Sequence, residues 1–302
     1  MRQYLKVVIA ILAIYLLFYF QIVSIDAFIT FTSNLSAVDI LKLVTLTFLL
    51  VIGTYFRWYF CSIFFGIHIP KKKLIKVSSE AYTFGQIIPG QLGIDGWRIL
   101  QFKDLDETRF KSKLLAVTIV EKIISLLAQL IVFILFLFIL FEVKIAFYKI
   151  AFLFIFILFG SILFFKISKY LIQKKLQVDI QNGSTWNLLK IFIFSISLNL
   201  VACCLIFFIS QTMLGDDGLS FLRTSIAMLA SNISAAIPIT PNGVGLAEFL
   251  YSKMLSIMGE DSKTVLHGTS YLIYRIFNIL GHFCVYVSST FITSLKWRLP
   301  IE

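Results

Sequence analysis

The chain has 302 residues, of which 59% are hydrophobic and 14% are charged, and its mean hydropathy is +0.92. Soluble domains carry about 25% charged residues, so this composition excludes an ordinary soluble protein and predicts an integral membrane protein. The net charge of +11 is better explained by lipid headgroups and topology than by nucleic acid, because the basic residues flank apolar segments.

Six apolar segments are long enough to cross a membrane, which takes about 20 helical residues. In chain order they cover roughly 7–30, 40–65, 114–141, 145–165, 191–213 and 265–294. Two further stretches, about 78–97 and 224–250, contain proline and glycine and are too interrupted for simple spans. We therefore predict an all-α polytopic membrane helix bundle, with about six spanning helices plus two re-entrant or broken helices, in a single membrane domain over 1–302.

The two interrupted stretches are similar to each other. Ile88–Asp95 and Ile239–Glu248 each run from proline through small residues to a branched apolar residue, glycine and a carboxylate. Proline and glycine break helices, and a membrane tolerates the freed backbone groups only where protein buries them or a cavity exposes them. Two such breaks in corresponding positions indicate a transport site.

The basic residues predict the orientation of the spans, because lysine and arginine concentrate on the cytoplasmic side. With the N-terminus inside and six crossings, most of the 27 basic residues lie inside, and both termini are cytoplasmic. The chain then divides into halves of three spans, about 1–141 and 142–302, with one break in each. The breaks enter from opposite sides if neither is a full crossing, which is the geometry of an inverted repeat.

The two spans that follow the breaks contain three charged residues: Glu121, Lys122 and Arg275. A charge at the centre of a spanning helix costs about 2.5–3.5 kcal/mol, so it usually faces a cavity or a partner. Lys122 and Arg275 are candidates to neutralise an anionic substrate, with Glu121 orienting one of them. The structural alternatives are interhelical salt bridges, for example Glu121 with Arg275, or extension of Glu121 and Lys122 to the interface.

The breaks offer a second kind of anion site, because a helix that starts after Pro-Gly presents free N–H groups and a positive dipole end. The candidate headgroup residues there are Pro89, Gly90, Gly93, Asp95, Arg98, Pro241, Asn242, Gly243, Gly245 and Glu248. Arg98 is either a bidentate phosphate ligand or an interfacial residue. Asp95 and Glu248 are either helix caps or a proton-coupling pair, and the small residues alternatively serve close helix packing.

Other polar residues give weaker signals. Arg57 and Trp58 close the second span, where such a pair is usually an interface anchor. His267 and His282 lie on the last span with no identifiable catalytic partner. The sequence contains no hydrolase, nucleotide-binding or metalloprotease motif. We therefore expect no catalytic residues, no metal and no cofactor.

Four elements resemble a known family, in the family's order. Ile237–Glu248 resembles the Pro-x-(Ser/Thr)-Pro-Gly-Gly-(Ile/Leu)-Gly-x-x-Glu motif of the lysylphosphatidylglycerol synthase transmembrane region, a flippase-like family. Ile88–Arg98 looks like its Pro-Gly-x-x-Gly-(Glu/Asp)-x-x-Arg segment, and Ala116–Lys122 is similar to its Val-x-x-x-Glu-Arg element. Arg275 falls where the family has an arginine in the last span.

This chain departs from the family pattern at two positions. Asn242 stands where the family usually has glycine, and Lys122 stands where it usually has arginine, so the planar fork that binds phosphate in a bidentate way is lost there. The soluble aminoacyl-transferase domain of the full-length synthases has no counterpart before Glu302, so we expect no lysyl transfer.

The resemblance implies a bacterial or archaeal inner-membrane protein that moves lipids or lipid-linked sugars between leaflets. The expected substrate is an anionic phospholipid or a polyprenyl-linked glycan, bound between the two breaks. One alternative is a non-transporting accessory subunit of a glycosyltransferase or other envelope enzyme, and another is an intramembrane lipid-modifying enzyme that uses Glu121 or Asp95. Self-association into a homo-oligomer is left open, and no nucleic-acid partner is expected.

Overall fold

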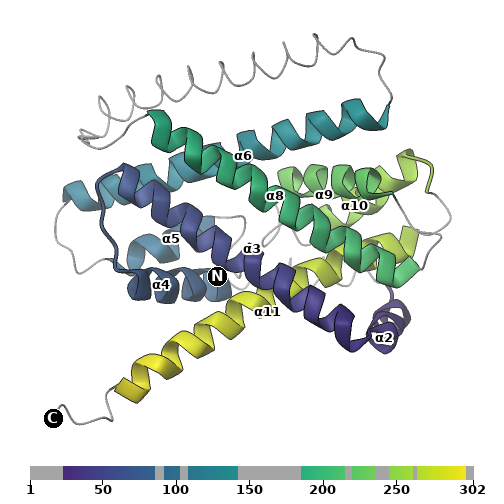
Figure 1. Cartoon of the computed structure of the whole chain (residues 1–302), viewed down its shortest axis with the longest axis horizontal. Coiled ribbons are helices and arrows are strands. Elements are labelled where there is room, and N and C mark those ends of the chain that lie inside the picture. Colours follow the sequence, from purple (N-terminus) through teal and green to yellow (C-terminus); the bar gives the residue numbers. More distant parts are fainter. Residues whose placement is uncertain are drawn as a thin grey trace, which may run out of the picture. The chain divides into compact units, whose positions relative to one another are not determined.

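The computed structural model describes residues 23–85, 92–102, 108–141, 185–214, 220–235, 245–260 and 264–296 (Figure 1). Within these ranges the regular structure is helical and contains no strand. This confirms the predicted all-α membrane bundle.

Four of the described helices are long and apolar enough to cross a membrane. They are α3 (Ala37–Phe64), α6 (Thr108–Leu140), α8 (Thr185–Leu214) and α11 (Thr264–Lys296). At about 1.5 Å per residue each exceeds the roughly 30 Å of a bilayer core. They coincide with the predicted spans 40–65, 114–141, 191–213 and 265–294, whereas the predicted span 145–165 lies outside the described residues.

The predicted first span, 7–30, extends too far along the chain. Residues 25–30 belong to a separate short helix, α2 (Ile25–Asn34), which begins after Ser24. Ser24 has an extended backbone, and its side-chain oxygen accepts a hydrogen bond from the Ala27 N–H at 3.3 Å. A serine in this conformation caps a new helix, so a helix that reaches Ser24 cannot continue unbroken through it. The earlier part of that span, up to residue 22, lies outside the described residues.

Each predicted broken segment is flanked by two short helices. The segment 78–97 overlaps α4 (Lys71–Phe84) at its start and α5 (Leu92–Leu100) at its end. The segment 224–250 overlaps α9 (Phe221–Ala235) and α10 (Leu246–Ile257) in the same way. None of the four helices reaches the roughly 20 residues of a span. The two helices of each pair pack against each other, so we call them the first hairpin (α4 and α5) and the second hairpin (α9 and α10).

The chain forms two compact units that interleave along the sequence. Unit 1 comprises Met1–Ile52, Pro70–Leu100 and Val201–Glu302, and unit 2 comprises Gly53–Ile69 and Gln101–Leu200. Both hairpins belong to unit 1, and so does α11, which packs on α4 and on α10. The long helices α3 and α8 each contribute one part to either unit. The predicted repeat halves are a different kind of division, based on topology, and remain a prediction.

Glycine permits the close packing of the first hairpin. Gly85 ends α4, and a Cβ atom at this position would lie 2.6 Å from the Ile94 Cα and 2.8 Å from the Gly93 carbonyl carbon of α5. Real Cβ atoms do not approach backbone so closely. Gly85 thus serves close helix packing, and of the small residues of the breaks, Gly93 lies directly at this contact.

We predict that Gly85→Ala destabilises the protein by about 1–3 kcal/mol, because the methyl group must displace the backbone of α5. Gly96→Ala is the matched control, since a Cβ at Gly96 meets nothing within 4 Å and alanine favours the helix by up to about 1 kcal/mol. Thermal unfolding of the detergent-solubilised variants measures both effects. Equal stability of the two variants would contradict the close contact.

Candidate functional site

In the second hairpin, α10 begins after a glycine whose backbone conformation strongly favours glycine. Gly245, the N-cap of α10, has φ +89°, in the region that disfavours residues with a Cβ. Its N–H donates a hydrogen bond of 2.8 Å to Oε2 of Glu248, which lies in the first turn. Glu248 is fully buried, and its negative charge lies at the positive end of the helix. The structure thus shows the capping role for Glu248.

Glu248 also holds the arginine of the last span. Arg275 Nη1 on α11 donates a 2.8 Å hydrogen bond to Glu248 Oε1, and the Arg275 side chain is only 9% exposed. Arg275 therefore forms an interhelical salt bridge, which was the structural alternative for this residue. The partner named as an example, Glu121, was wrong: Glu248 lies on α10, which packs on α11.

Polar side chains from four helices lie near this ion pair. Tyr271 on α11 donates a 2.7 Å hydrogen bond to the Asn232 side-chain oxygen on α9. The Tyr271 ring packs 5.2 Å from that of Tyr251 on α10, whose hydroxyl pairs with Ser210 at 3.1 Å. These contacts fix the helices around Glu248 and Arg275, so the ion pair lies within a rigid polar layer of unit 1.

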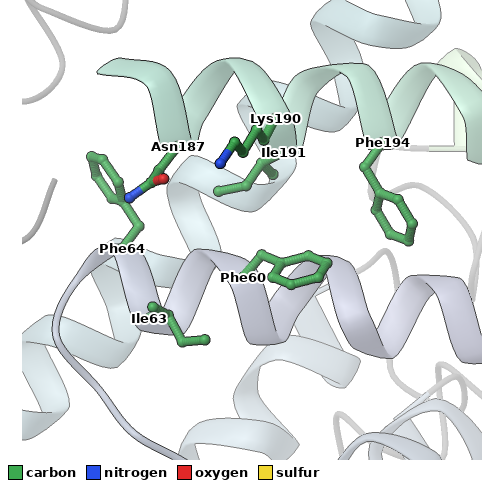
Figure 2. A pocket seen from close by; sticks show the side chains of 7 residues that line it. All are labelled: Phe60, Ile63, Phe64, Asn187, Lys190, Ile191 and Phe194. Carbon is green, nitrogen blue, oxygen red and sulfur yellow. The ribbon is translucent and has the colours of Figure 1, made fainter. Parts of the chain in front are cut away.

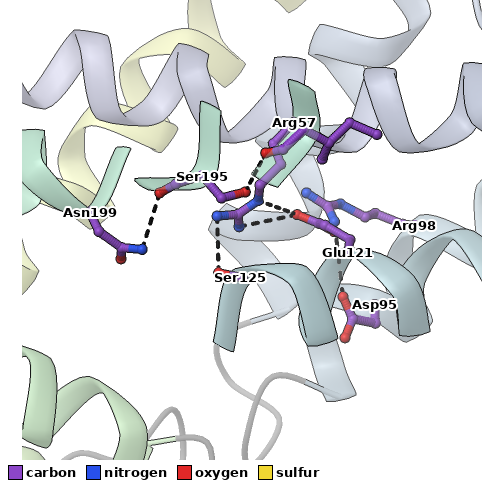
Figure 3. A network of polar contacts seen from close by, with 8 residues as sticks. Arg57, Asp95, Arg98, Glu121, Ser125, Ser195 and Asn199 are labelled. Atoms are coloured by element: carbon purple, nitrogen blue, oxygen red, sulfur yellow. Dashed lines mark hydrogen bonds and ion pairs between the residues drawn. The ribbon is translucent and has the colours of Figure 1, made fainter. Parts of the chain in front are cut away.

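The first hairpin carries a second charged cluster. Arg98, fully buried on α5, forms a 3.9 Å ion pair with Asp95 of the same helix (Figure 3). Its guanidinium carbon lies 4.9 Å from the centre of the Tyr82 ring on α4, a cation–π distance. Tyr82 in turn stacks on His282 of α11, with ring centres 4.2 Å apart and planes within 3°. Arg98 is thus buried within the protein.

Both clusters contact the same face of α11. Arg275 and His282 are seven residues apart, which is two helical turns and about 10 Å along the axis. On α11, Arg275 binds Glu248 in the first turn of α10, and His282 stacks on Tyr82 of α4, which contacts Arg98 of α5. We define these residues as the hairpin site: Asp95, Arg98, Glu248 and Arg275, with Tyr82 and His282.

The structure places Glu121 and Lys122 in the other compact unit. Glu121 on α6 is fully buried, and its Oε1 accepts hydrogen bonds from Arg57 Nε and pairs with Arg57 Nη2, both at 3.2 Å (Figure 3). Arg57 also donates to the Ser125 hydroxyl at 3.0 Å, and its side chain is 11% exposed. Arg57 was interpreted as an interface anchor, and that was wrong, because its side chain points inward to satisfy a buried carboxylate. Lys122 is partly exposed.

The remaining predicted site residues lie outside the described part of the chain: Pro89, Gly90, Pro241, Asn242 and Gly243. Tyr82 was not predicted as a site residue from the sequence, and His282 was given no functional role. Helical spacing offered a signal, because His282 follows Arg275 by two turns and so shares its face. Within the described ranges no group of three or more His, Cys, Asp or Glu side chains is arranged to hold a metal ion.

Comparison with known families decides the assignment of the chain. The family model described as "Lysylphosphatidylglycerol synthase TM region" matches residues 3–285. The chain belongs to this family. It is therefore a multi-pass membrane protein of the family, and the match includes every residue of the hairpin site. No curated protein matches the chain.

We predict that Glu248→Gln costs about 3–5 kcal/mol of stability, because it leaves the buried Arg275 charge without its partner. Glu260→Gln is the matched control: Glu260 pairs with Arg223 in the same unit, but both side chains are partly exposed. Exposed pairs contribute about 0–1 kcal/mol. Denaturant unfolding in detergent gives both values, and a loss at Glu248 no larger than at Glu260 would contradict the buried-pair interpretation.

Proposed function

We propose that this protein moves an anionic, phosphate-bearing lipid between the leaflets of a membrane, with the headgroup bound at the hairpin site. The observation that carries this proposal is the repeated constellation along α11: two helix starts, each next to a buried arginine–carboxylate pair, within one compact unit. Membership of a family of flippase-like membrane regions supports it.

The chemistry of the hairpin site suits a phosphate. The first turns of α5 and α10 present backbone N–H groups and the positive ends of their dipoles, which favour anions. An arginine adds planar, two-pronged donation to phosphate oxygens. Both features act strongly where water is excluded, and Arg98 and Glu248 are fully buried.

The two arginines have different roles in this proposal. Arg275 and Glu248 are 2.8 Å apart, which is the length of a strong charge-assisted hydrogen bond, and Glu248 also caps α10. This pair holds the second hairpin against α11. Arg98 and Asp95 both belong to α5, so their 3.9 Å ion pair does not join two helices, and we assign phosphate binding to Arg98.

The lipid-facing surface of the protein can accompany the acyl chains while the headgroup crosses. On the unit 1 part of α3, large apolar side chains are about half exposed, among them Val38, Val44, Phe48 and Leu49. Tails that stay in contact with such a surface remain in an apolar environment. The protein thus needs to shelter only the headgroup.

The proposed function also implies a membrane location, a substrate class and a partner enzyme. We place it in a bacterial or archaeal inner membrane with both termini cytoplasmic, because basic residues concentrate in the loops on that side. Its substrates are an anionic phospholipid, an aminoacylated phospholipid or a polyprenyl-linked glycan, since all of them carry phosphate. An envelope glycosyltransferase fits as the enzyme that supplies or consumes the lipid.

Transport by reconstituted protein tests this function. Vesicles with fluorescent phosphatidylglycerol should show protein-dependent movement between leaflets. Arg98→Gln should slow it at least about tenfold, because a charge-assisted hydrogen bond contributes about 1.5–3 kcal/mol. Arg275→Ala should abolish movement by releasing the second hairpin. Arg223→Gln, which breaks a partly exposed pair in the same unit, should transport like wild type.

Other results of these experiments would contradict the hairpin site or favour a different function. Wild-type rates in both Arg98→Gln and Arg275→Ala would overturn the hairpin site. Stable co-purification with a glycosyltransferase, without lipid movement, would favour an accessory subunit. A change in the mass of the bound lipid would favour an intramembrane enzyme. Where Arg275→Ala fails to fold, Glu248→Gln with Arg275→Gln removes both charges and retains the test.

A further inference from the structure

Unit 2 contains a groove that the hairpin site does not involve. The groove lies between the C-terminal part of α3 and the N-terminal part of α8, with a volume of about 310 Å³ (Figure 2). This is within the range of about 300–1,000 Å³ typical of ligand pockets. Its apolar lining consists of Phe60, Ile63 and Phe64 from α3, and Ile191 and Phe194 from α8.

The two helices run antiparallel along this groove. Gly53 of α3 meets Leu198 of α8 so closely that a Cβ atom would lie 2.2 Å from Leu198 Cδ2. Two turns further along α3, the Phe60 and Phe194 rings pack edge to face with centres 5.7 Å apart. The groove continues from there towards Phe64 and the start of α8. It is therefore closed by aromatic packing at one end and extends to the helix termini at the other.

The end near the helix termini is polar and positively charged. Asn187 and Lys190 line the groove from the first two turns of α8, facing the side chains of α3 (Figure 2). Lys190 is exposed, and its ammonium lies 6.0 Å from the ring of Trp186, which is 63% exposed. An exposed tryptophan beside a lysine at the end of a spanning helix is typical of the level of the lipid headgroups.

Charge and shape together identify an occupant. An apolar, aromatic-lined groove accepts an acyl chain, and a lysine with an amide at its end accepts a phosphate. We propose that this groove binds one anionic phospholipid of the surrounding leaflet, with an acyl chain between Phe60, Ile63 and Ile191 and the phosphate at Lys190 and Asn187. Its residues all belong to unit 2, so this site is independent of the proposed headgroup site in unit 1.

Position-resolved photo-crosslinking tests the groove. The full chain is reconstituted in phosphatidylcholine with a trace of phosphatidylglycerol that carries a diazirine on one acyl chain. Peptides covering 57–64 and 187–194 should be labelled. Unlabelled phosphatidylglycerol should displace the probe, whereas the same amount of phosphatidylcholine or soluble glycerol 3-phosphate should not.

Amino-acid substitutions test the contribution of the Lys190 charge separately from that of the apolar lining. In Lys190→Ala, about five- to tenfold more unlabelled phosphatidylglycerol should be needed for displacement, because each basic residue at the membrane surface contributes about 1 kcal/mol to anionic-lipid binding. Lys253→Ala removes an exposed lysine in unit 1 and should change nothing. Ile63→Trp fills the groove and should abolish labelling of these peptides. Transport should persist in Lys190→Ala, so failure here is distinguishable from failure of the proposed function.

Three results would overturn the proposal. Displacement by phosphatidylcholine would mean ordinary boundary lipid, and displacement by glycerol 3-phosphate would mean a soluble phosphate site. An unchanged displacement curve in Lys190→Ala, whose folding is checked by monodispersity, would remove the role of the lysine. Lys190→Arg keeps the charge and should restore wild-type displacement.

Discussion

The carboxylate of Glu248 joins α10 to α11 in unit 1. One oxygen accepts the N–H of Gly245 where α10 begins, and the other accepts Arg275 of α11. In a membrane no water can take over either bond. The broken helix and the charged last span therefore each need a partner inside the protein, and one residue supplies both. Because α11 also packs on α4, the position of the first hairpin depends on the same helix.

The same constraint accounts for the other buried charges. Arg98 lies beside Asp95 and on the Tyr82 ring, and Glu121 binds Arg57. Each pair reduces the cost of placing a charge among apolar helices, but the geometries differ. The pairs of Glu248 and Glu121 each join two helices, whereas the pair on α5 lies within one helix. That difference leads us to assign anion binding to Arg98 and structural roles to the other two pairs.

Much of the fold follows from the sequence, because hydropathy decides which segments leave water. Four spans were predicted close to their observed positions, and short helices flank each predicted break, since long apolar runs and Pro-Gly interruptions are local signals. Ser24 was overlooked, because a single capping serine hardly changes the hydropathy of a window. Partner choice was not predictable in the same way. A Glu121–Arg275 salt bridge was one example of a structural alternative, whereas Glu121 binds Arg57 and Arg275 binds Glu248, because pairing depends on how each helix is rotated and which neighbour it packs on.

Solid-state NMR measures directly whether a lipid phosphate binds beside Arg98. The protein is labelled with ¹⁵N in its arginine side chains and reconstituted in phosphatidylglycerol, and dephasing of the guanidinium signals by ³¹P is recorded. We predict dephasing that is reduced in Arg98→Lys and unchanged in Arg223→Lys. Dephasing that is the same in wild type and Arg98→Lys would place the phosphate elsewhere and contradict binding at Arg98.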